Sequence, residues 1–389
     1  MQFASSLALP PALPTVAPDL RRQLGGQAPD LVVAFVAGFD MSTALGLIQD
    51  LRAALQPAVF LACTAEGVIG AEHEVEQQPA VSVVGACLPG VTLRAFDLPP
   101  SRWPALLADP PEFESALALP AETQALLLLA DPFSTPIEEA LHVLNALRPG
   151  LPVIGGLASG AARPGYNVLA CNEHILNGGA VGVALAGALT VDVVVSQGCR
   201  PVGQPFTVTA ADHNWIHGLE NQSPVEQVQT LYASLAPEEQ SLMQNGLFIG
   251  RAIRPEAGAD ELGRGDFLVR GVLGVERQTG SLAIADRVQP GETIQFHVRD
   301  AATAREDLEL LLVPHTFGEP PAGALLFSCN GRGTRLFEGP DGDIGTVTEA
   351  LGVRPLAGFF CAGELGPVGG RNCLHGQTAS LALFRPRPA

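Results

Sequence analysis

The segment Gly358–Thr378, near the carboxyl end of the chain, reads GFFCAGELGPVGGRNCLHGQT. Its apolar start predicts a strand that ends at Cys361, and the glycines and proline from Gly363 to Gly369 predict a turn. Glu364 lies where this strand meets the turn, and glycine there lets a ligand approach the backbone closely. The pattern is typical of a β-hairpin with a solvated turn, but the varied polar residues that follow favour a ligand site. They are Arg371, Asn372, His375, Gln377 and Thr378.

A second polar cluster, Ser328–Arg335, follows a strand expected at Ala324–Cys329. Small residues flank Arg332, so we expect a flexible, exposed loop whose guanidinium pairs with a ligand carboxylate or with Glu364. Capping a helix or bridging a surface acid is the alternative role for Arg332. Because right-handed crossovers bring the carboxyl ends of parallel strands to one edge, we expect Arg332 and Glu364 to face one cavity. The candidate ligand-binding residues are Arg332, Glu364, Asn372, His375, Gln377 and Cys329, with Thr64 and Ser159 from the amino-terminal half.

One plan recurs three times along the sequence: a strand, a helix, a second strand, a glycine-containing turn and further strands. The second strands with their turns read AVFLACTAEGVIG, PVIGGLASG and PLAGFFCAGELG, and they begin at Ala58, Pro152 and Pro355. We interpret this as a degenerate internal repeat, although βαβ units resemble one another in any α/β protein. The predicted fold is therefore α/β with α+β character, with repeated β-α-β-β units, mixed sheets and helices on the outer faces. Ligands of open α/β sheets tend to bind at the carboxyl ends of the strands.

Other segments carry their own local patterns. Residues 1–29 and 99–122 are rich in proline and are expected to be irregular. Strands at Val168–Cys171 and Ala180–Leu185 are expected to form a hairpin around Asn177-Gly178. Between the second and third repeats, the sequence predicts a helix at 225–235, a hairpin at 267–286, a strand at 293–298 and a helix at 303–312.

Several of these stretches resemble the FIST family of sensory proteins. In the carboxyl-terminal half they are SCNGRG, LFEG, GFFCAGELGP and LHGQTASLALF, and in the amino-terminal half CTAEGVIG and PVIGGLASGA. The resemblance implies a FIST N-like domain over 30–205 and a FIST C-like domain over 206–389. It also implies an intracellular sensory module that binds a small ligand and signals through a partner protein. Small molecules such as amino acids are suggested as ligands of the family, and some members resemble haem-dependent nitric oxide sensors.

The composition narrows the classes of partner and chemistry. The 389 residues carry a formal net charge of −18, which disfavours binding to nucleic acid or to an anionic membrane. All 22 basic residues are arginines, so the chain lacks the lysine that Schiff-base or lysine general-base chemistry requires. Arginine is then the strong cationic group available for a ligand carboxylate or phosphate.

The seven cysteines lie far apart and without CxxC spacing, mostly inside apolar runs. They predict reduced, buried thiols and a cytoplasmic protein, and the amino terminus lacks the basic region of a signal peptide. Cys329 could instead be a nucleophile paired with His375 and oriented by Asn372 or Glu364, as in a thiol-dependent hydrolase. The alternative is that Cys329 is a small packed residue. The sequence contains no Gly-x-Ser-x-Gly elbow.

Histidines raise two further hypotheses. His213 and His217 have the i, i+4 spacing that would place both on one helical face as zinc ligands, although the residues between them suit a strand equally well. A single axial histidine could hold haem, and the candidates are His297, His315 and His375. The familiar P-loop, GxGxxG and HExxH motifs are absent from the sequence, which favours a ligand-binding sensory protein without a cofactor over an enzyme.

Overall fold

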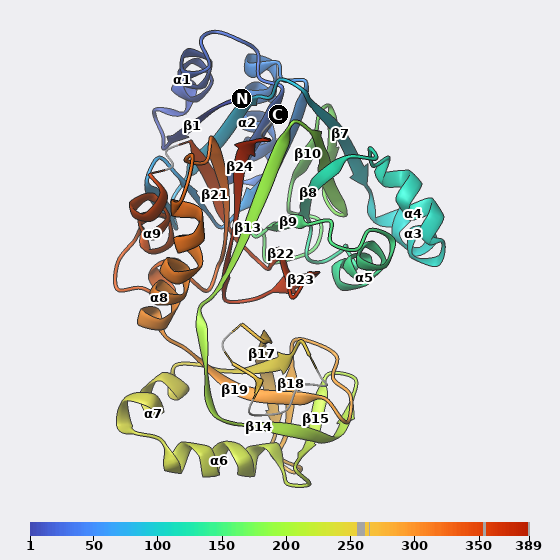
Figure 1. The fold of residues 1–389 in the computed structure, drawn as a ribbon, viewed down its shortest axis with the longest axis vertical. Coiled ribbons are helices and arrows are strands. Elements are labelled where there is room, and N and C mark those ends of the chain that lie inside the picture. Colours follow the sequence, from blue (N-terminus) through green and yellow to red (C-terminus); the bar gives the residue numbers. More distant parts are fainter. Residues whose placement is uncertain (255–260, 264, 353–354, 388–389) are drawn as a thin grey trace. The chain divides into compact units, whose positions relative to one another are not determined.

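The computed structural model describes residues 1–254, 261–263, 265–352 and 355–387, and it is mixed α/β as predicted (Figure 1). The chain divides into two compact units. Unit 1 comprises Met1–Ser196, Leu308–Leu374 and Thr378–Ala389, and unit 2 comprises Gln197–Asp307 and His375–Gln377. These units follow contacts in space and not the order of the sequence, so the division into halves at residue 205 stays a prediction.

Unit 1 is built from three mixed six-stranded sheets, whose strands are named in their spatial order. Sheet 1 contains β1 (Gln2–Ala8), β6 (Ala80–Cys87), β2 (Leu31–Ala37), β3 (Val59–Ala65), β10 (Leu169–Cys171) and β11 (His174–Leu176). Sheet 2 contains β23 (Arg371–His375), β22 (Glu364–Val368), β9 (Val153–Leu157), β8 (Thr123–Ala130), β12 (Ala180–Gly187) and β7 (Val91–Leu98). Sheet 3 contains β13 (Leu189–Gln197), β24 (Thr378–Pro386), β20 (Gly323–Cys329), β21 (Leu356–Cys361), β4 (Gly67–Gly70) and β5 (His73–Glu76).

The three sheets confirm the predicted repeat. Each has a central pair of parallel strands, β2–β3, β8–β9 or β20–β21, whose crossover contains one helix. The first strand of each pair is also paired, antiparallel, with the strand that closes the repeat: β6, β12 or β24. Because these central strands are buried on both faces, they appear in the sequence as continuous apolar runs, and this is why they could be recognised.

The repeats are interlocked by an exchange of hairpins. The hairpin β4–β5 follows the second strand of the first repeat but extends sheet 3, beside β21. In the same way β10–β11, from the second repeat, extends sheet 1, and the strands β22 and β23, from the third repeat, extend sheet 2. The outer strands β7 and β13 likewise join the sheet of the following repeat, so no repeat completes its own sheet.

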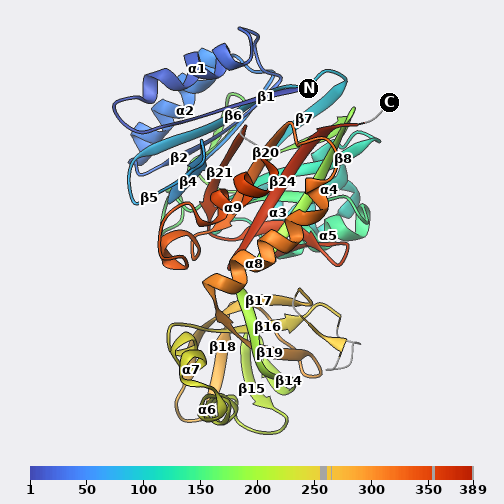
Figure 2. The same cartoon turned by 60° about the vertical axis from the view of Figure 1, so that its left-hand side comes forward.

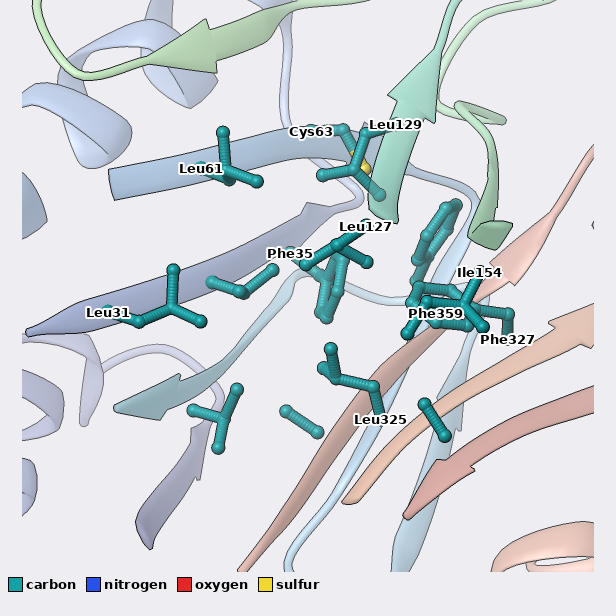
Figure 3. Packing of buried hydrophobic residues seen from close by; sticks show 14 of the residues in the cluster. Leu31, Phe35, Leu61, Cys63, Leu127, Leu129, Ile154, Leu325, Phe327 and Phe359 are labelled. Atoms are coloured by element: carbon teal, nitrogen blue, oxygen red, sulfur yellow. The ribbon is translucent and has the colours of Figure 1, made fainter. Parts of the chain in front are cut away.

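The inner faces of the three sheets share one hydrophobic core (Figure 3). Phe35 from sheet 1 stacks on Phe359 from sheet 3 with ring centroids 4.8 Å apart, and Leu127 from sheet 2 lies close to them. Helices cover the outer faces, as Figures 1 and 2 show for α1 and α2 on sheet 1. The helices of unit 1 are α1 (Val16–Gln23), α2 (Met41–Leu55), α3 (Trp103–Ala108), α4 (Pro110–Leu117), α5 (Ile137–Leu147), α8 (Ala301–Leu312), which runs into it from unit 2, and α9 (Gly342–Leu351).

Four local predictions were wrong. The turn expected from Gly363 to Gly369 is mostly the strand β22, which pairs with β9 of another repeat. Residues 1–29 are not irregular, because Gln2–Ala8 forms β1 against β6, a partner too distant in sequence for a local pattern to show, and α1 follows. Residues 99–122 contain α3 and α4, whose prolines stand at the first turn, where a helix tolerates them. The strand β10 pairs with β11 and not with β12, and the turn between them contains Asn172 in the left-handed region, with φ of 53°.

In its described residues, unit 2 is a closed six-stranded barrel with two α-helices of its own. Its strands in order around the barrel are β14 (Cys199–Asp212), β15 (Trp215–Leu219), β18 (Ser281–Ile284), β17 (Phe267–Glu276), β16 (Leu247–Ala252) and β19 (Thr293–Arg299), and its helices are α6 (Pro224–Ser234) and α7 (Pro237–Gln244). The helices predicted at 225–235 and 303–312, the hairpin at 267–286 and the strand at 293–298 are confirmed. Within the described residues, no helix has both the length and the apolar character needed to cross a bilayer.

Candidate functional site

The carboxyl ends of the central strands of all three repeats surround one hollow of about 620 Å³, which we call the axial hollow. Each repeat contributes the residues that directly follow its first or second parallel strand. The lining residues are Gly38, Phe39, Ala65, Glu66, Pro132, Phe133, Ser159, Gly160, Ala161, Ala162, Asn330 and Ala362. The threefold repeat therefore brings strand-end turns together that lie almost 300 residues apart in the sequence.

A second hollow of about 480 Å³, the side lobe, shares part of this wall. The shared residues are Gly38, Phe39, Ala65, Gly160, Ala161 and Ala162. The side lobe adds Val36, Asp40, Met41, Thr64, Arg163 and Tyr166. The wall common to the two hollows is made mostly of glycine and alanine, so a ligand can lie close to the backbone there.

Hydrogen bonds between repeats hold the turns around the axial hollow in place. The hydroxyl of Ser159 donates to the backbone oxygen of Phe360, and it accepts from the backbone N–H of Glu66 at 2.8 Å. Ser159 thus links all three repeats. Gly160 is required by the same close packing, since a Cβ at this position would lie 2.6 Å from Cβ of Thr64. Hydrogen bonds and close packing within the protein therefore hold these turns in position without a ligand.

The charged groups beside the axial hollow are already paired with each other. Arg335 forms an ion pair with Glu66, and it donates a hydrogen bond to the backbone oxygen of Asn330 at 2.5 Å. The side chain of Arg335 is 46% exposed and that of Glu66 is 35% exposed, so solvent weakens this pair. The pair leaves the axial hollow with little net charge of its own.

The side lobe holds an arginine and a carboxylate that are arranged differently. The guanidinium of Arg163 lies 3.9 Å from the ring centroid of Tyr166, and Arg163 has no carboxylate partner among the described residues. Asp40 is the N-cap of α2, where the hydroxyls of Ser42 and Thr43 hold the pKa of its carboxyl far below the usual range. Among the described residues, Oδ2 of Asp40 accepts a hydrogen bond only from the Thr43 hydroxyl, at 2.6 Å, which leaves it a further acceptor position.

Arg332 is not exposed in a flexible loop, and that expectation was wrong. Its side chain is fully buried, and Nε and Nη2 donate to the two carboxylate oxygens of Asp343 at 2.8 and 2.6 Å. The guanidinium also lies 5.6 Å from the ring centroid of Phe337. Arginine stays charged when it is buried, and Asp343 offsets the cost of burying that charge. The fork that we expected to bind a ligand carboxylate is therefore occupied by a carboxylate of the protein.

Glu364 belongs to the same buried cluster. Its Oε2 accepts from the hydroxyl and the N–H of Thr378 at 2.8 and 3.3 Å, whereas Oε1 has no hydrogen-bond partner among the described residues. Burial raises the pKa of Glu364 to about 8, against the opposing effects of Thr378, the Cys329 thiol and Arg332. The structure thus brings Arg332, Glu364 and Cys329 together, as expected, but in a closed cluster that does not line the axial hollow.

Glu74, on the exchanged hairpin β4–β5, extends this cluster to the start of α9. Its carboxylate accepts the N–H groups of Gly342, Asp343 and Ile344 at 2.9 to 3.2 Å. Burial, and then the charge of Asp343, raises the pKa of Glu74 to about 8. We call Glu74, Arg332, Asp343 and Glu364 the acidic clamp. It fixes α9 and the Asn330–Arg335 loop to a hairpin from another repeat.

The remaining candidate residues have separate positions. Asn372 has a structural role, because its side-chain amide connects three residues by hydrogen bonds. The NH₂ group donates to Asn145 Oδ1 and to the backbone oxygen of Leu151, and Oδ1 accepts from the Val153 N–H, at 2.8 to 3.0 Å. Thr64 lines the side lobe, while its hydroxyl accepts from the Val168 N–H at 2.9 Å. His375 and Gln377 group with unit 2. Only Thr64 and Ser159, among the eight candidates, line the two hollows.

The catalytic and haem hypotheses are predictions that the fold does not test. Cys329 belongs to unit 1 and His375 to unit 2, so the Cys329–His375 pair stays a prediction. His297 fills its own space inside the barrel, since a Cβ on Gly250 would come within 2.3 Å of its ring, and burial lowers its pKa to about 4. For His297, His315 and His375, haem binding stays a prediction that a Soret band would check.

The zinc hypothesis required a helix that is not there. His213 follows β14 in a turn with φ of 52°, and His217 lies on β15, where its ring contacts the hydroxyl of Ser281 at 2.9 Å. The two imidazoles therefore do not share a helical face. All seven cysteines are free thiols, and five of them are buried.

Sequence reasoning missed Asp40, Phe133 and Arg163. All three lie just beyond a strand end in the first or second repeat, in turns with fewer polar residues than the third. The repeat itself was the usable signal, because it places these turns at positions equivalent to the turns after β20 and β21. The density of polar residues in a turn is a poorer guide to the residues that line the hollows, because it points to the residues of the acidic clamp instead.

Sequence comparison matches residues 30–222 to the FIST N domain and residues 227–367 to the FIST C domain. An uncharacterized protein of Mycobacterium tuberculosis is 40% identical over 384 residues, covering 95% of this chain and 98% of the relative. An uncharacterized protein of Mycobacterium bovis is 40% identical over 368 residues, covering 94% and 92% of the two chains. A crystal structure of cyanuric acid hydrolase from A. caulinodans covers 99% of this chain with a TM-score of 0.38 and 8% identity, a similarity too low to bear on function.

Proposed function

Since this chain belongs to the FIST family, whose domains are associated with sensory signal transduction, we propose that it is a sensory protein that binds a small carboxylate. The ligand site is the axial hollow with its side lobe. An α-amino acid is the carboxylate that best matches the groups present. The bound state would be communicated to a partner protein.

The observation that carries this proposal is the pair of charged groups in the side lobe. Arg163 presents a guanidinium without a carboxylate partner among the described residues, and a ligand carboxylate is the group that its planar fork binds best. Asp40 remains ionised at neutral pH and has an acceptor position for an ammonium group. Arg163 thus takes the role that we expected of Arg332, and the side chain of the ligand would extend into the axial hollow.

A thermal-shift screen with the protein amino acids and their deaminated carboxylic acids tests the proposal. A ligand that binds only the folded protein raises its apparent stability. Losing a charged hydrogen-bonding pair should weaken binding at least about tenfold, so Arg163→Ala should abolish most of the shift. Isothermal titration of the best compound then gives the affinity of each variant.

Arg277→Ala is the matched control, because Arg277 is an exposed arginine on the β17–β18 turn of unit 2. This variant should bind the compound as the unmodified protein does. The proposal is contradicted if no compound of the panel raises the apparent stability, or if Arg163→Ala binds with unchanged affinity.

A further inference from the structure

Large apolar side chains are exposed around the two hollows. Phe133 is 44% exposed, Tyr166 is 45% exposed and Met41 is 40% exposed, and each lines one of the hollows. Phe39 is half-buried in the wall that the hollows share. Exposed aromatic side chains that gather around a concave surface are typical of a site that a ligand covers.

Phe133 is held in its exposed position by a rigid turn. Its N–H donates to Oδ2 of Asp131 at 3.2 Å, and the next residue, Ser134, donates its hydroxyl to the same oxygen at 2.6 Å. Asp131 is fully buried, and its other oxygen accepts from the Asn167 amide at 2.9 Å. The backbone beneath the Phe133 ring is therefore anchored from inside the protein, while the ring itself lies at the surface of the axial hollow.

The two hollows differ in the chemistry of their linings. The side lobe contains the charged groups Arg163 and Asp40, whereas the axial hollow adds Pro132 and Phe133 to the shared Phe39. The charged pair of Glu66 and Arg335 in and beside the axial hollow is internally neutralised. An uncharged, flat side chain is thus the group that suits the axial hollow, with its faces against aromatic rings and its edge against small residues.

We propose that the ligand of this site is an amino acid with an aromatic side chain, an inference that rests on the function proposed above. The carboxylate binds Arg163 and the ammonium binds Asp40 in the side lobe. The aromatic ring lies in the axial hollow against Phe133 and Phe39. Phe133 is then the residue that determines specificity, because ring–ring contacts add to the affinity beyond what burial of apolar area gives.

Isothermal titration with L-phenylalanine, L-cyclohexylalanine and L-leucine tests this specificity. L-cyclohexylalanine has the shape of L-phenylalanine but a saturated, more apolar ring, so a merely apolar hollow would prefer it. An aromatic contact should instead make L-phenylalanine bind about three- to tenfold more tightly. In Phe133→Leu this preference should disappear, while the affinity for L-leucine should stay within about twofold of that of the unmodified protein.

The outcomes separate the two proposals. If L-leucine or L-cyclohexylalanine binds as tightly as L-phenylalanine, and Arg163→Ala abolishes that binding, the aromatic specificity is overturned and the carboxylate site stands. If the preference for L-phenylalanine survives in Phe133→Leu, Phe133 is not the specificity-determining residue and the assignment of the axial hollow is overturned. If none of the three compounds binds, aromatic recognition is rejected, and the wider carboxylate screen decides the proposed function by itself.

Discussion

The strand-end turns of the third repeat and those of the first two repeats occupy equivalent places but differ in burial and in the pairing of their charges. In the third repeat, Arg332 is buried and its fork is closed on Asp343. In the first and second repeats, small residues such as Ala65 and Gly160 line an open hollow, with Arg163 at its edge. The comparison shows that a turn rich in polar residues can form a buried ion pair that stabilises the fold. A charged side chain is available to a ligand only where it stays exposed.

The largest expected difference is in stability. Arg332→Ala leaves Asp343 buried without its cation, and breaking a buried pair in this way costs about 3–5 kcal/mol of the free energy of unfolding. Arg163→Ala, in a strand-end turn of the second repeat, should change it by less than about 0.5 kcal/mol, because Arg163 is exposed. Urea denaturation followed by circular dichroism measures both.

The double variant Arg332→Met/Asp343→Leu is the control for this comparison. It removes both charges and keeps apolar volume, so it should be more stable than Arg332→Ala. If Arg332→Ala is as stable as Arg163→Ala, the acidic clamp does not hold the third repeat together and the contrast between the turns is lost.

A smaller effect is expected in the pH dependence of stability. Burial raises the pKa of Glu364 in the folded protein to about 8, from 4.5 for a solvated glutamate. Between these values the folded state keeps a proton that the unfolded chain has lost. The contribution of Glu364 is therefore fully present below pH 4.5 and is lost as pH rises toward 8, by roughly 1 kcal/mol per pH unit.

Glu364→Gln imitates the protonated side chain and should remove this loss, so its stability relative to the unmodified protein should increase from pH 5 to pH 8. Glu74, whose pKa burial raises in the same direction, remains in the variant, so part of the pH dependence should persist. Urea denaturation at several pH values between 5 and 8 gives the dependence of the free energy of unfolding on pH for the variant and for the unmodified protein. Parallel curves for the two proteins would show that Glu364 is already ionised in the folded state.

Much of the fold could be predicted because its central strands are local, continuous apolar runs, as at Leu31–Ala37 and Leu356–Cys361. The exchange of hairpins could not be predicted from the sequence. The strand β4 pairs with β21, almost 300 residues away, and nothing in either strand specifies that partner. The burial of Arg332 depends on Asp343, eleven residues further on, and on α9, which Glu74 caps from the first repeat. Arg163 was missed for the same reason: it lines the side lobe only because of the place that its turn takes among the repeats.

The smallest expected effect concerns the place where β1 and β24 meet. The strands β7 and β13 each follow the closing strand of one repeat and join the next sheet, and β1 holds the equivalent place in sheet 1. The rings of Phe3 on β1 and Phe384 on β24 stack with centroids 5.2 Å apart, so the two strands already lie together.

A circular permutant can join the chain ends through a short flexible linker and open at the exposed residues 121–122, between α4 and β8. It should fold, with a free energy of unfolding within about 1 kcal/mol of that of the original chain. A second permutant opened between Ser82 and Val83, inside the buried strand β6, should not fold, because it divides a strand that pairs with both β1 and β2. Urea denaturation and circular dichroism distinguish the two, and equal behaviour of both permutants would mean that the threefold plan does not govern the stability of unit 1.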